Sequence, residues 1–182
     1  MTRKILMTLL AFPSLLISLI MGTANAESKE LVIGAPAPAF KLKDQHGDFH
    51  QLEQYNKKWL VLYFYPSDDT PQCTKEACHF RDDIAKLKKL NASVIGISLD
   101  DQKSHEDFST KYNLQFPLLS DTDSTVSQAY GSLFSILGFK FSKRHSFIID
   151  PDGKIAKIYR DVDADTHSQE IIKDLSQLIN SK

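Results

Sequence analysis

The sequence predicts an α/β domain in which helices flank a central mixed β-sheet. The continuously apolar stretch 59–65 has the composition of a strand that is buried on both faces, and the stretch 93–99 is interpreted as a second central strand. A segment with helical periodicity follows each of them, as expected when neighbouring strands run parallel. The turn Asp150-Pro151-Asp152-Gly153 separates two further apolar stretches and adds an antiparallel pair.

Each element rests on its own pattern. Apolar runs or alternating apolar residues between turns predict strands at 40–42, 49–52, 59–65, 93–99, 116–120, 146–149 and 155–159. Helical periodicity predicts helices at 74–90, 102–112, 123–130 and 166–179. Asp123 is the expected cap of the third helix, and Asp165 or Thr166 that of the last. The apolar stretch 132–143 has no clear form, and core, partner-binding surface and substrate rim all remain open for it.

The first residues have the pattern of a secretory signal peptide. Arg3 and Lys4 precede an apolar-rich run, and Ala24-Asn25-Ala26 supplies small residues at a cleavage site. We therefore expect residues 1–26 to be removed by cleavage after Ala26. An uncleaved anchor is the alternative, although the apolar run lies at the lower length limit for a membrane span.

The mature chain, residues 27–182, is expected to be one exported domain, periplasmic or secreted. It shows no internal repeat or low-complexity linker. Loss of the two positive charges of Arg3 and Lys4 changes the net charge from −1 to −3, and no long basic run remains. We therefore expect no nucleic-acid partner and, after cleavage, no membrane partner.

The stretch from Tyr63 to Cys78 carries the strongest chemical signal. It begins as a strand, passes through a turn rich in Pro and Asp, and ends as a helix with Cys73 near its start. Unpaired backbone N–H groups and the helix dipole at such a position favour a thiolate over a thiol.

Cys73 and Cys78 are the only cysteines of the chain. After export they would lie in an oxidising compartment, where disulfides form and persist. A structural disulfide is disfavoured, because so short a loop constrains the unfolded chain little and the domain is large enough to build its own core. On one helix the two side chains point about 140° apart with a rise of roughly 7.5 Å. A disulfide needs Cα atoms about 5.5–6 Å apart, so the helix must unwind before the bond can form. Such a pair is typical of a catalytic redox cycle.

The spacing Pro66-x-x-x-Thr70-x-x-Cys73 resembles the active-site motif of peroxiredoxins. Cys78, five positions later, is similar to the second cysteine of the subfamily called bacterioferritin comigratory protein or peroxiredoxin Q. The resemblance covers nearly all of residues 30–180. It implies a thioredoxin-like fold of the peroxiredoxin type, with an N-terminal β-hairpin extension.

The same resemblance implies a thioredoxin-dependent peroxidase of the atypical two-cysteine kind, acting in antioxidant defence and redox homeostasis. Hydrogen peroxide or an organic hydroperoxide would oxidise Cys73 to a sulfenic acid, and Cys78 would resolve it as an intramolecular disulfide. A thioredoxin-like dithiol would then reduce the disulfide. No metal or other cofactor is implied, and members of this subfamily are often monomeric. For Cys78, an inert buried thiol is the alternative reading.

The motif assigns supporting roles as well. Thr70 would orient the peroxide, and Pro66 would shield the sulfur from bulk water. Arg144 matches a family arginine that stabilises the thiolate and holds the peroxide, although a surface arginine ending a strand is the plain alternative. The chain departs from the subfamily at Gln72, which replaces a usual Gly, and at Ser146, which replaces a common Thr.

Other patterns are weaker or lead elsewhere. Glu76 fits equally well as an acid that complements the helix dipole and as a residue that orients the catalytic turn. A calcium loop at 161–172 lacks the required Gly and the terminal Glu, and His46 and His50 are expected on an exposed hairpin.

The alternative function is an exported thioredoxin-like thiol–disulfide oxidoreductase or a copper-handling module. Such modules normally show two or three residues between their cysteines, whereas four separate Cys73 from Cys78 here.

Overall fold

The computed structural model describes residues 31–181, and the expected signal segment 1–26 with its cleavage site lies outside them. The strands are β1 (Lys41–Lys43), β2 (Phe49–Gln51), β3 (Trp59–Phe64), β4 (Ala92–Ser98), β5 (Leu118–Ser120), β6 (Leu133–Ile136), β7 (Phe139–Ser142), β8 (His145–Ile149) and β9 (Ile155–Tyr159). The helices are the 3-10 turn η1 (Leu52–Tyr55) and α1 (Pro71–Lys89), α2 (Gln102–Tyr112), α3 (Thr125–Ala129) and α4 (His167–Asn180).

A seven-stranded sheet organises these elements in the order β2-β1-β5-β4-β3-β8-β9. The central strand β3 is parallel to β4 and antiparallel to β8, so the sheet is mixed as expected. At the end of β3, Phe64 is paired with Ile97 on one side and His145 on the other. This pairing places the start of β8 beside the loop that leaves β3.

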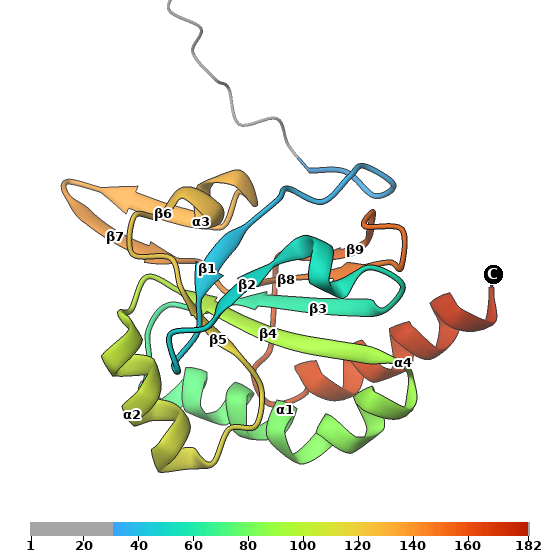
Figure 1. Cartoon of the computed structure of the whole chain (residues 1–182), viewed down its shortest axis with the longest axis horizontal. Coiled ribbons are helices and arrows are strands. Elements are labelled where there is room, and N and C mark those ends of the chain that lie inside the picture. The colour runs from blue at the N-terminus through green and yellow to red at the C-terminus, as the bar shows by residue number, and fades with distance from the viewer. Residues whose placement is uncertain (1–30, 182) are drawn as a thin grey trace, which may run out of the picture.

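The continuous apolar run of β3 is explained by burial on both faces. Trp59, Val61 and Tyr63 pack into one core cluster, and Leu60 and Leu62 pack into the other. Alternate side chains of a strand point to opposite faces, so both layers of the core depend on this one strand. Helices α1, α2 and α4 cover the first face, and α3 and η1 lie on the opposite side of the sheet (Figure 1).

Helix α1 begins at Pro71, three residues earlier than the predicted 74. Proline is favoured in the first turn because its φ is already helical and its missing N–H would have no partner there. The earlier start places Cys73 in the first turn and Glu76 in the second. Helix α2 has the predicted bounds, and α4 follows Thr166, whose side chain makes no capping hydrogen bond.

The third helix is capped differently from the prediction. Its N-cap is Ser124, and the amides of Val126 and Ser127 donate to the buried carboxylate of Asp121 at 3.1 and 2.7 Å. The carboxylate of the predicted cap, Asp123, accepts from the amide and the hydroxyl of Thr125. The carboxylate below the helix start therefore takes most of the capping role.

The stretch 132–143, which had no assigned form, is a separate β-hairpin. Strands β6 and β7 pair with each other in a two-stranded sheet, and Leu137 and Gly138 turn between them with φ of 48° and 87°. Figure 1 shows the hairpin projecting from the main body at the end of the sheet where β3 and β4 finish. Among residues 31–181, no helix combines the length and apolar composition that a membrane crossing requires.

Candidate active site

Cys73 lies in the first turn of α1, directly after the loop that connects β3 to this helix. Its side chain is only 1% exposed and packs in the same core cluster as Ala77 and Phe80. Cys78 is half-buried on another side of the helix, and both cysteines are free. The divergence expected for two thiols on one intact helix is thus present.

Arg144 reaches this cysteine from a distant part of the chain, the link between β7 and β8. One guanidinium nitrogen, Nη2, donates to Cys73 Sγ at 3.2 Å, and Nη1 donates to Glu76 Oε2. Burial acts to lower the pKa of Arg144, but the negative charges of Glu76 and Cys73 outweigh burial and raise it. The guanidinium therefore stays charged while it contacts the sulfur.

Glu76 is a buried carboxylate, 1% exposed, and its ion pair with Arg144 holds the guanidinium in place. Burial raises the pKa of Glu76 to about 7, although the charge of Arg144 opposes the shift. Because Glu76 lies in the second turn of α1 and away from solvent, the reading as a dipole-complementing acid is wrong. Its contact assigns it to the positioning of Arg144.

Thr70 and Pro66 lie in the loop before the helix. Thr70 is the N-cap of α1, and its hydroxyl proton is donated to the Ser67 carbonyl at 3.1 Å. Pro66 is half-buried and directly follows the last buried residue after β3. Of the predicted site residues, the structure therefore brings Cys73 and Arg144 into hydrogen-bond contact, while Thr70 is bonded within its own loop.

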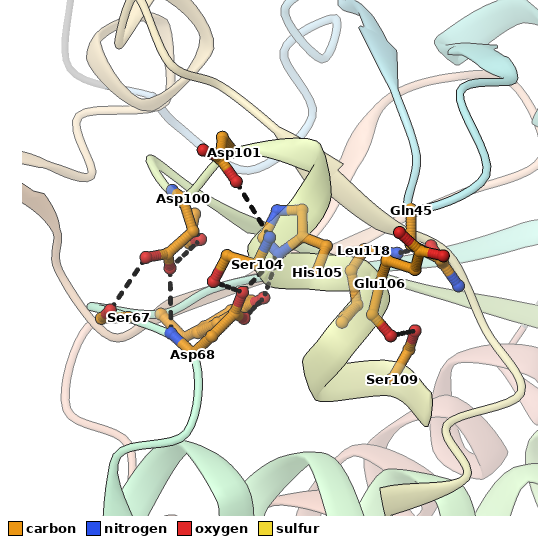
Figure 2. Close-up of polar contacts among 12 residues, drawn as sticks. Gln45, Ser67, Asp68, Asp100, Asp101, Ser104, His105, Glu106, Ser109 and Leu118 are labelled. Carbon is orange, nitrogen blue, oxygen red and sulfur yellow. Dashed lines mark hydrogen bonds and ion pairs between the residues drawn. The ribbon is translucent and has the colours of Figure 1, made fainter. Parts of the chain in front are cut away.

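Two aspartates hold that loop, as Figure 2 shows. The Asp100 carboxylate, just after β4, accepts from the Ser67 hydroxyl and the Asp68 amide, both at 2.9 Å. It also accepts from the Ser98 hydroxyl at 2.6 Å. These bonds tie the loop after β3 to the loop after β4, and so fix the approach to Cys73.

The Asp68 side chain is the second support. Its buried carboxylate accepts from the hydroxyls of Tyr65 and Ser104, both at 2.7 Å, and from His105 Nδ1 at 2.8 Å (Figure 2). Tyr65 directly follows β3, and Ser104 and His105 lie in α2, so Asp68 joins the end of β3 to α2 beneath the loop. Sequence reasoning missed Asp68, Asp100 and His105, because an Asp in a turn gives no sign of its distant partners.

Tyr63 is a further residue that the sequence did not single out. Its ring packs against Phe80 at 4.8 Å, and its buried hydroxyl has no hydrogen-bond partner within the described part of the chain. Burial, followed by the charge of Glu76, raises the pKa of Tyr63 well above its usual value. Gly96 makes room for it, since a Cβ there would lie 2.8 Å from the Tyr63 hydroxyl. A glycine inside a buried strand was the available signal.

The first turns of α1 are also fastened to the segment before α4. His79 Nδ1 lies 3.1 Å from the Ala164 carbonyl, and Lys75 forms an ion pair with Asp165 at 2.7 Å. Any unwinding of the helix around Cys78 must break such contacts. In the range 31–181, no three His, Cys, Asp or Glu side chains gather as metal ligands.

The sequence matches the model of the AhpC/TSA family over residues 33–158. A putative peroxiredoxin bcp from Coxiella burnetii is 43% identical over 144 residues, which cover 77% of this chain and 95% of that protein. The chloroplastic peroxiredoxin Q of Suaeda salsa is 41% identical, over 80% of this chain and 68% of its own length.

Solved structures of peroxiredoxins are similar to this chain as well. The peroxidoxin BcpB of Mycobacterium tuberculosis superposes with a TM-score of 0.77 at 34% identity, covering 81% of this chain and 98% of that one. A cysteine-to-serine mutant of Xylella fastidiosa PrxQ gives 0.78 at 29% identity, covering 82% and 98%. The Xanthomonas campestris bacterioferritin comigratory protein, solved for its alkyl peroxide reduction activity, gives 0.74 at 30%, covering 81% and 98%. The thioredoxin-like fold of the peroxiredoxin type is thereby confirmed.

Proposed function

We propose that this chain, which belongs to the AhpC/TSA family as a peroxiredoxin of the bcp and Q kind, reduces hydrogen peroxide and organic hydroperoxides through Cys73. Peroxiredoxins of this kind are peroxidase oxidoreductases. The observation that carries the proposal is the Cys73 sulfur at the start of α1, in contact with a guanidinium that Glu76 holds. The alkyl peroxide reduction described for the Xanthomonas campestris relative supports organic hydroperoxides as substrates.

The first step oxidises Cys73. Its thiolate attacks one peroxide oxygen, the O–O bond breaks, and the departing oxygen takes a proton to leave as water or alcohol. Cys73 becomes a sulfenic acid. Arg144 can stabilise negative charge both on the sulfur and on the departing oxygen, because a guanidinium presents several N–H donors in one plane. Backbone N–H groups of the first helical turn add to this field.

Thr70 and Pro66 act around that step. The Thr70 hydroxyl can accept a hydrogen bond from the peroxide while it donates to Ser67, because a hydroxyl is both a donor and an acceptor. Pro66 has no N–H and limits the access of water to the sulfur from the side of β3. Asp68 and Asp100 keep the loop that carries both residues in register with α1.

The second step joins the two cysteines. The Cys78 sulfur attacks the sulfur of the sulfenic acid, the S–O bond breaks, and the hydroxyl takes the proton of the Cys78 thiol and leaves as water, so an intramolecular disulfide forms. Because the side chains diverge on one helix, the first turns of α1 must unwind and release contacts such as the Lys75–Asp165 ion pair. A thioredoxin-like dithiol then reduces the disulfide to two thiols and is itself oxidised.

The setting of this activity follows from the N-terminal pattern. We propose that residues 1–26 are a signal peptide and that the domain acts as a monomer in the periplasm or outside the cell. Its role there would be antioxidant defence and redox homeostasis.

The test is a turnover assay with the chain starting at Glu27, reduced thioredoxin and either hydrogen peroxide or tert-butyl hydroperoxide. Consumption of both peroxides is expected for the parent, with no turnover for Cys73→Ser. Ser176→Ala, a change far along α4, is the matched control and should retain the parent rate. Turnover that persists in Cys73→Ser would contradict the proposal.

A further inference from the structure

The hairpin β6–β7 has one continuous apolar face. Its register pairs Phe134 with Phe141 and Ile136 with Phe139, so these four side chains share a face. The rings of Phe134 and Phe141 stack with centroids 4.6 Å apart. Ile136, Phe139 and Phe141 are 55%, 75% and 38% exposed, so most of this face is open to solvent.

The tip of the hairpin is the most exposed apolar site in the described chain. Leu137 is 94% exposed, Phe139 75% and Ile136 55%. Leu137 also has a φ of 48°, in the left-handed region where Gly or Asn is favoured over a branched apolar residue. Neither solvent nor the local backbone favours leucine at this position. Its presence points to an apolar partner that contacts the tip.

The charged side chains of the segment that carries the tip have one sign. Residues 124–149 contain no Asp or Glu. Lys140 and Lys143 line a hollow of about 500 Å³ beside the hairpin, together with polar groups that include Gln128 and Ser135. Among residues 31–181, neither lysine forms a salt bridge with a carboxylate. The hairpin therefore combines an apolar tip with unneutralised positive charge just behind it.

We propose that this hairpin docks on an anionic phospholipid bilayer. Ile136, Leu137 and Phe139 enter the boundary between headgroups and acyl chains, as apolar faces of interfacial segments do. Lys140, one position further from the tip, and Lys143 then reach the phosphates, whose negative charge they complement. This proposal replaces the prediction, made from the net charge of −3, that the mature chain has no membrane partner. That net charge does not oppose the contact, because the field near the bilayer is set by the nearest charges.

The docking also bears on which peroxide reaches Cys73. This second step rests on the proposed function. Strand β7 ends at Ser142, and Arg144 follows two residues later with its contact to Cys73. His145 then pairs with Phe64, where the catalytic loop begins. A docked hairpin therefore places the Cys73 end of the sheet next to the membrane, so hydroperoxides of membrane lipids become the substrate class.

The binding test uses the chain starting at Glu27, which keeps every described helix and strand, and peroxide-free vesicles. Sedimentation is compared for phosphatidylcholine alone and for phosphatidylcholine with phosphatidylglycerol. The parent should bind the anionic vesicles, and Leu137→Asn with Phe139→Ser should lower the apparent affinity at least about tenfold. Asparagine suits the positive φ, so this variant should keep its fold, as circular dichroism can verify.

Two further variants separate the contributions. Lys140→Gln with Lys143→Gln should remove the preference for anionic vesicles. Phe49→Ser is the matched control, since Phe49 is 54% exposed and also lies beside two lysines, Lys41 and Lys43, but on a different part of the fold. It should bind as the parent does. Equal loss in Phe49→Ser, or no loss in the tip variant, would overturn the proposal.

The competing occupant is a second copy of the chain. Sedimentation velocity without lipid should show the same monomer for the parent and the tip variant. A dimer that the tip variant abolishes would overturn membrane docking.

A final readout compares phospholipid hydroperoxide in anionic vesicles with soluble hydrogen peroxide. The tip variant should lose the first activity and keep the second. If the parent reduces neither peroxide, the proposed function fails, while vesicle binding still decides the docking.

Discussion

Arg144 donates to the sulfur of Cys73 at 3.2 Å although 71 positions separate the two residues in the chain. The contact exists because β8 pairs with the end of β3, where the loop to α1 begins. The guanidinium of Arg144 is also held by a second contact, its ion pair with the buried Glu76. The site is thus a product of the sheet register, and several changes near it have predictable effects.

Arg144→Lys should slow the oxidation of Cys73 by about a hundredfold, because an ammonium cannot contact the sulfur and Glu76 in one plane. Stopped-flow measurement of the second-order rate constant with hydrogen peroxide checks this. Arg81→Lys, on the same helix as Cys73 but bonded to Asp82 and the Tyr112 carbonyl, is the control and should keep the parent rate. A change of less than threefold in Arg144→Lys would exclude the role.

Glu76 should make stability depend on pH. Its pKa is raised from 4.5 to about 7, chiefly by burial, so the folded protein binds more protons than the unfolded chain between these values. This contribution is fully present below about pH 4.5 and is lost as pH rises through about 7. Relative to Glu76→Gln, the free energy of unfolding of the parent should therefore fall by roughly 1–3 kcal/mol over this range. Urea titrations at a series of pH values measure the difference, and a flat or rising difference would refute the assignment.

Asp68→Asn should destabilise the protein by about 2 kcal/mol, because an amide oxygen cannot accept from all three donors beneath the loop. The oxidation rate of Cys73 should fall as well, since the loop is then held less firmly. The neighbouring change Asp69→Asn is the control: Asp69 is exposed and bonded to Lys111, and asparagine tolerates its φ of 55°. Equal losses in the two variants, measured by chemical denaturation, would argue against a special role of Asp68.

Gly96→Ala should destabilise the fold by about 1–3 kcal/mol through overpacking. The added Cβ would lie 2.8 Å from the ring tip of Tyr63 and from Leu118 Cδ2. Tyr63→Phe removes the hydroxyl oxygen, which is one of the three atoms at 2.8 Å and lacks a hydrogen-bond partner, and leaves the ring carbon Cζ, so the double variant should recover part of the loss. Thermal denaturation of the four proteins in this cycle gives the coupling, and strict additivity would contradict the packing described.

Local patterns of apolar residues in the sequence predicted most of the helices and strands. The apolar run of β3 and the stripe of α1 depend on burial alone, and the structure confirms both. The start of α1 was missed by three residues, since a Pro at the first helical position resembles the turn before it. That error mattered, because it left Glu76 in the first turn and hid its burial.

The site was predictable only in part. Cys73 is marked by its place at a helix start, whereas Arg144 was found through the motif that it shares with peroxiredoxins. Asp68 and His105 meet across 37 positions, and no local pattern encodes such a pair. The hairpin β6–β7 was also missed, because an apolar stretch with a single Gly gives no alternation that separates core from surface.

The most direct test of the central claim is a stoichiometric oxidation. The reduced chain starting at Glu27, Cys73→Ser and Cys78→Ser would each receive one equivalent of hydrogen peroxide, followed by intact-mass analysis and thiol counting. The account predicts a fast intramolecular disulfide in the parent and a trapped sulfenic acid in Cys78→Ser. Cys73→Ser should react no faster than a free thiol. If the parent reacts as slowly as Cys73→Ser, peroxidase chemistry at Cys73 is contradicted.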